Sequence, residues 1–305
     1  MMEKQSRPIF GISVLFALGF LASAPAKEGE ARVFQLEWKS GLSSLGLCIE
    51  RGDWILAVIP KEIESQSTTG PTLEAGKSSL STEILYFDPI QRLCLLQTES
   101  VIEGATPMAV ASSPGPRPGD TLTCCFSKSK CQTTVAGKEW SYRGKTFQLP
   151  LMRVRLADPE GKGCKPGTPL FNKDGEVEGL ITEHTLDTKG EALAIPASRV
   201  RKLVRDVKKY DRSGPVWIGL VFHNHSSSPE VIEVKPDSPA SEAGIEEGDV
   251  ILSVNDEPVQ DLNELSEIVL SLPAGEKATV EILRGLKNKE VTLVPQFAKV
   301  SAAAN

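Results

Sequence analysis

Short runs of apolar residues, separated by turn-forming residues, repeat along the chain between about residues 40 and 198. Representative runs lie at residues 54–59, 83–87 and 93–96, and a long segment rich in proline and glycine lies at residues 113–120. Short strands with Gly, Pro and Asp turns between them are typical of all-β barrels and sandwiches. The scattered prolines also disfavour interior helix. The pattern therefore predicts a mainly β domain in this part of the chain.

The periodicity changes at about residue 197. Between residues 197 and 210, apolar residues recur at the i, i+3, i+4, i+7 spacing of a single helical face. These residues are Val200, Leu203, Val204 and Val207. Residues 199–212 hold seven Lys/Arg and two Asp/Glu, and we expect this basic face to be solvated. The sequence predicts a helix followed by a linker at residues 211–215, where Gly and Pro break it.

A second β-rich unit follows the linker. Apolar strand patterns lie at residues 216–221, 231–234, 250–255, 280–285 and 291–294. A helix pattern occupies residues 262–270, with Asp261 as a natural N-cap. The chain has a net charge of −6, and residues 214–305 hold 15 Asp/Glu but only 6 Lys/Arg. This acidic balance argues against nucleic acid as a partner.

The N-terminus has the order of an export signal. A positively charged start that includes Lys4 precedes an uncharged apolar run at residues 9–22, and Ala24-x-Ala26 offers a cleavage site. These are the regions of a secretory signal peptide, and the run is shorter than a typical membrane-spanning helix. We expect residues 1–26 to be removed and the protein to be exported to the periplasm or cell envelope, with an uncleaved membrane anchor as the alternative.

Six cysteines follow the predicted signal, and their state is open. In an oxidising compartment they could form disulfides, whose pairing the sequence does not decide. They could equally be small buried hydrophobic residues. No Cys/His spacing typical of zinc occurs, and no phosphate-binding loop, so we expect neither metal nor cofactor. The cysteines are Cys48, Cys94, Cys124, Cys125, Cys131 and Cys164.

Four motifs in the second β-rich unit occur in the order seen in PDZ domains of bacterial periplasmic proteases. They are Ile218-Gly219-Leu220, SPASEAGI at residues 238–245, EGDVILSVN at residues 247–255, and LPAG at residues 272–275. The unit resembles those domains over about 80 residues. The resemblance implies an α/β domain at residues 214–296 that captures the end of another polypeptide, followed by a flexible tail at residues 297–305.

The resemblance also implies which residues bind the peptide. Ile218, Gly219, Leu220 and Val221 would form the loop and strand to which a peptide adds as an extra strand. The turn at Gly219 would expose backbone amides to a terminal carboxylate. The helix would contribute the opposite wall. Its two candidate residues, which are also consistent with a purely structural core role, are Leu265 and Val269.

Four stretches of the first β-rich unit resemble the trypsin-like domain of the HtrA/Deg protease family. They lie at residues 53–56, 87–96, 163–177 and 194–198. In the family, the first stretch usually opens with Asp-Gly, whereas this chain has the reversed order Gly52-Asp53. The resemblance implies a trypsin-like double β-barrel at residues 27–198 and a helical linker at residues 199–213.

The catalytic positions implied by this resemblance are vacant. The position of the family's His is Pro60, that of its Asp is Arg92, and that of its nucleophilic Ser is Pro166. The chain has three histidines, none of which lies between the signal and residue 183. A serine hydroxyl is a poor nucleophile without a base. Proline at 166 also removes a backbone N–H where the family forms its oxyanion hole.

We considered whether other residues could supply chemistry. Cys164 could act as a thiol nucleophile with His184 as its base, which would make the chain an active serine-type endopeptidase with a displaced catalytic set. Residues 127–130, which read Ser-Lys-Ser-Lys, fit a solvated hairpin tip better than a Ser/Lys pair. His223 and His225 lack a third metal ligand nearby and fit an exposed polar edge.

The sequence thus predicts an exported two-domain protein that does not catalyse proteolysis and binds peptides through its PDZ domain. Expected partners are polypeptide C-termini, unfolded exported proteins and active proteases of the HtrA type, which it would serve as an adaptor, regulator or holdase. The resemblance also suggests a homo-trimer. A purely structural envelope protein with a closed PDZ groove is a third possibility.

Overall fold

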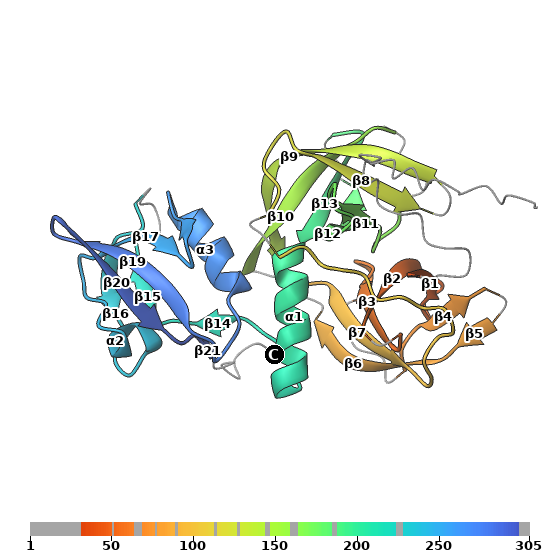
Figure 1. Cartoon of the computed structure of the whole chain (residues 1–305), viewed down its shortest axis with the longest axis horizontal. Coiled ribbons are helices and arrows are strands. Elements are labelled where there is room, and N and C mark those ends of the chain that lie inside the picture. The colour runs from red at the N-terminus through yellow and green to blue at the C-terminus, as the bar shows by residue number, and fades with distance from the viewer. Residues whose placement is uncertain are drawn as a thin grey trace, which may run out of the picture.

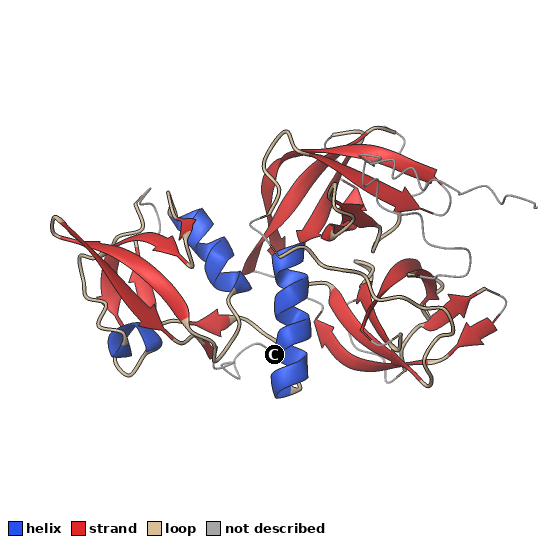
Figure 2. Ribbon diagram, in the orientation of Figure 1, coloured by secondary structure: helices blue, strands red, loops and turns tan. Residues whose placement is uncertain are grey.

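The computed structural model describes residues 32–298, except residues 51, 64–68, 77, 89–90, 113–114, 127–128, 144–146, 159–163, 185–187 and 224–227. The predicted signal peptide lies outside the described residues. Strands dominate the described part of the chain (Figure 2), which confirms the mainly β fold class. No helix among the described residues is long and apolar enough to cross a membrane.

The first unit is a seven-stranded antiparallel sheet with the order β5-β4-β1-β2-β3-β7-β6. Its strands are β1 (Val33–Glu37), β2 (Ser43–Glu50), β3 (Trp54–Val58), β4 (Thr72–Ala75), β5 (Ser78–Leu80), β6 (Thr82–Asp88) and β7 (Leu93–Thr98). The apolar runs found in the sequence at residues 54–59 and 93–96 are thus the neighbouring central strands β3 and β7.

The second unit is a closed antiparallel barrel with the order β10-β13-β12-β11-β8-β9. Its strands are β8 (Thr121–Phe126), β9 (Ser129–Arg143), β10 (Phe147–Leu156), β11 (Pro169–Phe171), β12 (Val177–His184) and β13 (Glu191–Pro196). Closure leaves no free edge in a small barrel.

The strands β3 and β7 are apolar on both faces because successive side chains enter two different cores. Ile55 and Leu96 pack in a core inside the first unit, whereas Leu56 and Leu95 pack in a core shared with the second barrel. Side chains of a strand alternate between its faces, so a strand covered on both sides reads as a continuous apolar run. The shared core holds these two units together, and we call them the two barrels below.

Helix α1 (Ala197–Tyr210) begins directly after β13, as the periodicity predicted. Val200, Leu203 and Val207 of its apolar stripe are buried in the core shared by the two barrels. The helix ends at Asp211, which adopts the left-handed conformation with φ of 56°. In Figure 1 the helix stands between the two barrels and the C-terminal unit.

The C-terminal unit consists of three small sheets and two helices around one core. The sheets pair β14 (Val216–Trp217) with β21 (Gln296–Phe297), β15 (Leu220–Phe222) with β16 (Val231–Val234), and β17 (Val250–Val254) with β18 (Glu257–Pro258), β19 (Ala278–Arg284) and β20 (Lys287–Leu293). The helices are α2 (Pro239–Glu242) and α3 (Leu262–Ser271). Asp261 caps α3 as predicted, since its carboxylate accepts a hydrogen bond from the Glu264 N–H.

The expectation of a flexible tail from residue 297 is wrong for its first residue. Phe297 belongs to β21, where it lies opposite Val216, and its ring packs edge-on against Tyr210 of α1 with centroids 5.4 Å apart. The guanidinium of Arg212 lies 4.2 Å from the same ring. The residues after Ala298 lie outside the described part of the chain.

The expectation of a solvated basic face on α1 is wrong for two residues. The side chains of Arg199 and Lys202 are only 1% and 2% exposed. The Lys202 ammonium contacts the buried carboxylate of Asp206 and donates to the Gly214 carbonyl at 2.8 Å. It also lies 5.7 Å from the Phe297 ring centroid. The C-terminal unit covers these two residues, whereas Arg205, Lys208 and Lys209 of the same helix are exposed as expected.

Candidate functional site

Arg92, at the position where the sequence resemblance implies a catalytic Asp, is buried where the two barrels meet. Its side chain is 4% exposed. Its Nε donates to the Ile59 carbonyl at 3.0 Å, and its Nη2 donates to the Thr182 carbonyl of β12 at 3.3 Å. A fixed, fully charged guanidinium thus spans from the first unit to the second barrel. A cation at this position cannot orient an imidazolium or stabilise its charge, as the carboxylate of a catalytic triad does.

Pro60, at the position where the sequence resemblance implies a catalytic His, directly follows Ile59, whose carbonyl accepts from Arg92. The Ile59 N–H donates to the Arg92 carbonyl at 3.0 Å, so Pro60 lies next to the residue that Arg92 holds. Pro60 is buried, and its carbonyl accepts a hydrogen bond from Ile63 N–H at 3.0 Å. Its side chain offers neither a proton acceptor nor a proton donor.

Pro166, at the position where the sequence resemblance implies a nucleophilic Ser, lies in a tight turn fixed to both barrels. Its carbonyl accepts a hydrogen bond from Leu45 N–H of β2 at 2.7 Å, and the next amide, Gly167 N–H, donates to the Ile181 carbonyl at 2.7 Å. Gly167 has φ of +91°, and a Cβ there would lie 2.1 Å from the Leu45 carbonyl oxygen. Only glycine fits this close approach of the two chains.

The amides of this turn are already used within the protein. Lys165 N–H donates to Thr168 Oγ1 at 3.0 Å, and Thr168 N–H donates to the Lys165 carbonyl at 3.0 Å. Together with Gly167 these bonds occupy every N–H from residue 165 to 168, because Pro166 has none. An oxyanion hole needs amides that are free to point at the substrate. The turn cannot offer one at residues 165–168 in this conformation.

Cys164, the alternative nucleophile, is half-buried just before this turn. Burial, reinforced by the nearby negative charge of Asp158, raises the pKa of its thiol. Nucleophilic cysteines have lowered pKa values, because the thiolate is the reactive form. Its proposed base, His184, ends β12, and its side chain lies outside the described residues, as do residues 127–128 of the Ser/Lys stretch.

The residues predicted to bind peptide lie at a narrow apolar groove between β15 and α3, which we call the β15–α3 groove. It encloses a cavity of about 10 Å³, enough for about one water molecule. Five further residues line it. Three of them, Ile251, Val254 and Leu272, lie in the sequence motifs but had no role assigned to them. The lining residues are Ile218, Leu220, Ile251, Val254, Leu265, Val269, Leu272, Val280 and Leu293.

The predicted binding residues do not all contribute to the lining of this cavity in the same way. Val221 belongs to β15 but does not line the cavity, since neighbouring residues of a strand face opposite sides. Leu265 lines the cavity and is also part of the domain core, with 3% of its surface exposed. Val269, one turn further along α3, is half-buried.

The free edge of β15 has the geometry needed to accept another strand. Lys235 N–H donates to the Gly219 carbonyl at 2.8 Å, which makes Leu220 and Val234 a pair without mutual hydrogen bonds. The N–H and C=O of Leu220 therefore point away from β16. Among the described residues, β15 pairs only with β16. A peptide can thus reach this edge by the strand addition that such grooves use.

Gly219 fixes the loop at the start of this strand. It has φ of +84°, and a Cβ there would lie 2.1 Å from the Cβ of Ser238. Ser238 is fully buried because its hydroxyl caps α2, accepting from Ser241 N–H at 3.1 Å. The Ile218 carbonyl accepts from Ala240 N–H at 2.9 Å, which ties the loop to the same helix.

The remaining candidate residues carry no metal chemistry in the described part of the chain, where no group of three or more His, Cys, Asp or Glu could hold a metal ion. His223 is exposed at the end of β15, and His225 lies outside the described residues. The cysteines are divided between the two states left open by the sequence. Cys124 is disulfide-bonded, whereas Cys48 and Cys94 are buried thiols.

Comparisons with known proteins agree with both resemblances. The family model of the PDZ domain matches residues 216–294. A probable periplasmic serine endoprotease, DegP-like, from Pseudomonas fluorescens is 31% identical over 238 residues, which cover 72% of this chain and 49% of that protein. Its counterpart from a Marinomonas species is 26% identical over 225 residues, covering 68% and 47%. The chain thus spans about half the length of the curated relatives it matches.

Solved structures share the fold. The HtrA-type protease AlgW with a tripeptide matches with a TM-score of 0.58 and 16% identity, covering 89% of this chain and 95% of that one. The serine endoprotease from Yersinia pestis matches with a TM-score of 0.51 and 19% identity over the same shares. The trypsin-like β-barrel fold followed by a PDZ domain is thereby confirmed. Together with the curated relatives, these findings show that the chain is similar to PDZ-containing serine proteases of the HtrA/DegP type.

Proposed function

We propose that the protein is an exported, non-catalytic member of this family that binds polypeptide C-termini or unfolded exported proteins in its β15–α3 groove. The observation that carries the proposal is Arg92. A buried guanidinium, held by carbonyls of both barrels, stands where the family's chemistry needs a carboxylate. Pro60 and Pro166 remove the base and the nucleophile from the same region, and the groove keeps the features that peptide binding requires.

Other parts of the proposal rest on the relatives. The curated relatives are described as periplasmic, which supports export of this chain. Solved relatives contain a bound tripeptide or decapeptide, which supports recognition of a peptide terminus. We extend the proposal to regulation or support of active HtrA-type proteases, in which the protein would act as adaptor or holdase. A homo-trimer is part of the same proposal.

The narrowness of the groove favours one alternative, a structural envelope protein whose groove stays closed. A cavity of about 10 Å³ does not hold a side chain. Peptide binding therefore requires α3 to move away from β15, as grooves do when a ligand selects a minor open state. The two functions differ in whether that open state is reached in solution.

Fluorescence anisotropy with labelled peptides that end in a free carboxylate tests the proposal. We expect Leu220→Glu to weaken binding about 10-fold or more, because it places a carboxylate in the apolar groove opposite the incoming terminus. Leu286→Glu is the matched control, since Leu286 is fully exposed at the turn between β19 and β20. Absence of binding across a C-terminal peptide array, with circular dichroism showing a folded protein, would favour the closed structural role.

A digestion assay with casein or denatured protein tests the catalytic alternative separately. We expect no cleavage by the purified protein. Cleavage that persists through purification and disappears in Cys164→Ala or His184→Ala would overturn the non-catalytic assignment and identify a displaced catalytic set.

A further inference from the structure

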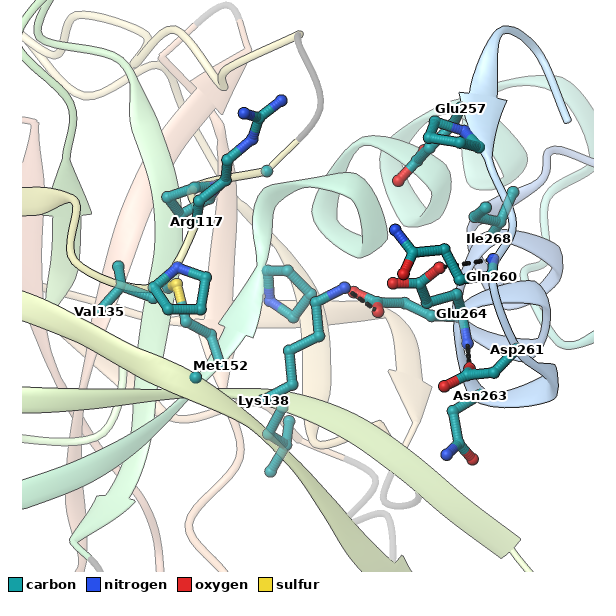
Figure 3. A pocket seen from close by; sticks show the side chains of 18 residues that line it. Arg117, Val135, Lys138, Met152, Glu257, Gln260, Asp261, Asn263, Glu264 and Ile268 are labelled. Carbon is teal, nitrogen blue, oxygen red and sulfur yellow. Dashed lines mark hydrogen bonds and ion pairs between the residues drawn. The ribbon is translucent and has the colours of Figure 1, made fainter. Parts of the chain in front are cut away.

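A second and larger hollow lies between the second barrel and the C-terminal domain. This interdomain cleft has a volume of about 540 Å³, within the range of ordinary ligand sites. One wall is formed by α3 and the residues before it, and the other by β9, β10 and the segment at residues 115–118 (Figure 3). Different faces of α3 line the two hollows, because Glu264 and Glu267 face the cleft whereas Leu265 and Val269 face the β15–α3 groove.

The wall formed by the PDZ domain is acidic. Glu257, Asp261, Glu264 and Glu267 line the cleft from this side, against Arg117 and Lys138 from the barrel side. The Asp261 and Glu264 carboxylates are partly used within the domain. Asp261 accepts from Glu264 N–H, and Glu264 accepts from Gln260 N–H, both at 2.8 Å. The Glu257 side chain is exposed and forms no hydrogen bond or ion pair with the described residues, which leaves its carboxylate available.

Part of the lining of the cleft, which we call its floor, is apolar. Leu151, Met152 and Val135 of the barrel and Ile268 of α3 contribute to it, together with prolines of both walls. An apolar floor with carboxylates at its rim suits a side chain that has an aliphatic stem and a cationic head. Lysine and arginine are the side chains with this construction.

The chain itself already places one such side chain in the cleft. Lys138 of β9 crosses toward α3, and its ammonium lies 2.6 Å from the Glu267 carboxylate (Figure 3). The Lys138 ammonium thus forms an ion pair with the Glu267 carboxylate but not with the Glu257 carboxylate. Burial, together with the negative charges of Glu267 and Glu264, raises the pKa of Glu257 despite the opposing charges of Lys138 and Arg201. A further cation at Glu257 would relieve this repulsion.

We propose that the interdomain cleft binds a lysine or arginine side chain of an extended polypeptide, with its alkyl part on the apolar floor and its cationic head at Glu257. The site is distinct from the β15–α3 groove and needs no free C-terminus. It would let the protein hold a basic internal segment of a chain, whether or not a terminus is bound elsewhere.

Anisotropy titration of the full-length mature protein with two labelled ten-residue peptides tests this site. Both peptides are Gly/Ser-rich, acetylated and amidated, and differ only in two lysines that are replaced by glutamines in the second. We expect the lysine peptide to bind more tightly and to lose affinity as NaCl is raised, because salt screens exposed ion pairs. Glu257→Gln should weaken its binding about 3- to 5-fold, as expected for loss of one accessible ion pair.

Glu290→Gln is the matched control, because Glu290 is exposed on β20 and does not line the cleft. Equal affinity of the lysine and glutamine peptides would overturn the proposal, as would equal effects of Glu257→Gln and Glu290→Gln. Loss of lysine-peptide binding in Leu220→Glu, but not in Glu257→Gln, would also overturn it by placing the peptide in the β15–α3 groove. Thermal unfolding of each variant verifies that the domains remain folded.

Discussion

The barrel interface around Arg92 and the β15–α3 groove are built in opposite ways. At the barrel interface, the polar groups that an active protease would direct at a substrate bond to one another, as Arg92 does with the Ile59 and Thr182 carbonyls. At the groove, the backbone of Leu220 points its N–H and C=O away from the neighbouring strand. Polar groups that form hydrogen bonds within the protein stabilise its fold. Recognition of a ligand, in contrast, requires polar groups whose hydrogen bonds are not formed until the ligand binds.

Under the function proposed above, the first domain has exchanged chemistry for stability. Arg92 links the two barrels through carbonyls that a shorter residue could not reach, and the turn at Pro166 links β2 to β12 in the same way. Both positions therefore contribute to the contact between barrels. The PDZ domain, in contrast, keeps a glycine with positive φ at position 219 and, among the described residues, a strand edge on β15 without a partner strand.

The largest expected effect is the removal of the barrel link. Arg92→Ala leaves the buried Ile59 and Thr182 carbonyls without this donor, so we expect the free energy of unfolding to fall by about 3–4 kcal/mol. Urea denaturation followed by fluorescence measures it. Arg117→Ala is the control, because the Arg117 side chain is exposed. A loss below about 1 kcal/mol, similar to the control, would show that Arg92 is not a structural link.

The next effect concerns the groove, and two glycines provide a matched pair. Gly219→Ala combines left-handed strain with a contact of 2.1 Å to Ser238, whereas Gly285→Ala has the strain, at φ of +61°, but nothing within 4 Å. We expect unfolding free energies to fall by about 2–3 kcal/mol and about 1 kcal/mol respectively. Only Gly219→Ala should also abolish peptide binding in the anisotropy assay. Equal losses in both variants would mean that Ser238 yields and the loop is not fixed.

The smallest expected effect is the loss of stability in acid, which can be compared between the two domains. Each domain holds a buried carboxylate in contact with arginine: Glu191 contacts Arg153 and Arg155, and Asp249 contacts Arg284. Hydrogen bonding from Arg153 lowers the pKa of Glu191, with Arg155 contributing, against the effect of burial. Burial raises the pKa of Asp249 in the PDZ domain, but hydrogen bonds from Arg284 outweigh this and lower it. A carboxylate whose folded pKa is lowered stabilises the fold above its unfolded pKa, and loses this as the pH falls through the folded pKa.

We therefore expect stability to decline as the pH falls below the ordinary pKa of each carboxyl group, 4.5 for Glu191 and 3.8 for Asp249. Glu191→Gln and Asp249→Asn should each be less stable than the parent at pH 7 and should show a smaller decline between pH 5 and pH 3. Thermal unfolding across this range measures the slopes. A slope unchanged in one variant would mean that its carboxylate does not couple to folding.

Much of the fold could be predicted from local pattern. The apolar stripe that includes Val200, Leu203 and Val207 predicted the correct extent of α1. Asp261 was correctly predicted as the N-cap of α3. The continuous apolar runs of β3 and β7 indicated strands, although the sequence did not show that they serve two cores. Periodicity depends on a chain's own geometry, so it is visible without knowing what packs against each face.

Contacts between distant parts of the chain could not be predicted in this way. Phe297 looked like part of a frayed tail, and Lys202 like part of a solvated basic face, because nothing near them in the sequence indicates their partners. Each contacts a distant part of the chain: Phe297 packs on Tyr210, and Lys202, beside Asp206, lies close to the Phe297 ring. The interdomain cleft is likewise formed by segments more than a hundred residues apart.

The sequence by itself determined which groups are present: proline, arginine and proline at three positions of a protease pattern, and a glycine at the start of a binding strand. Only the tertiary structure decided what those groups do. In the folded protein, Arg92 donates to carbonyls of both barrels, and the amides beside Pro166 form hydrogen bonds within the protein. The β15–α3 groove is narrow, and an acidic wall of the C-terminal unit lies opposite the second barrel. The physical reason is that hydrogen bonds, burial and charge interactions depend on distances in space, which the order of residues fixes only after folding.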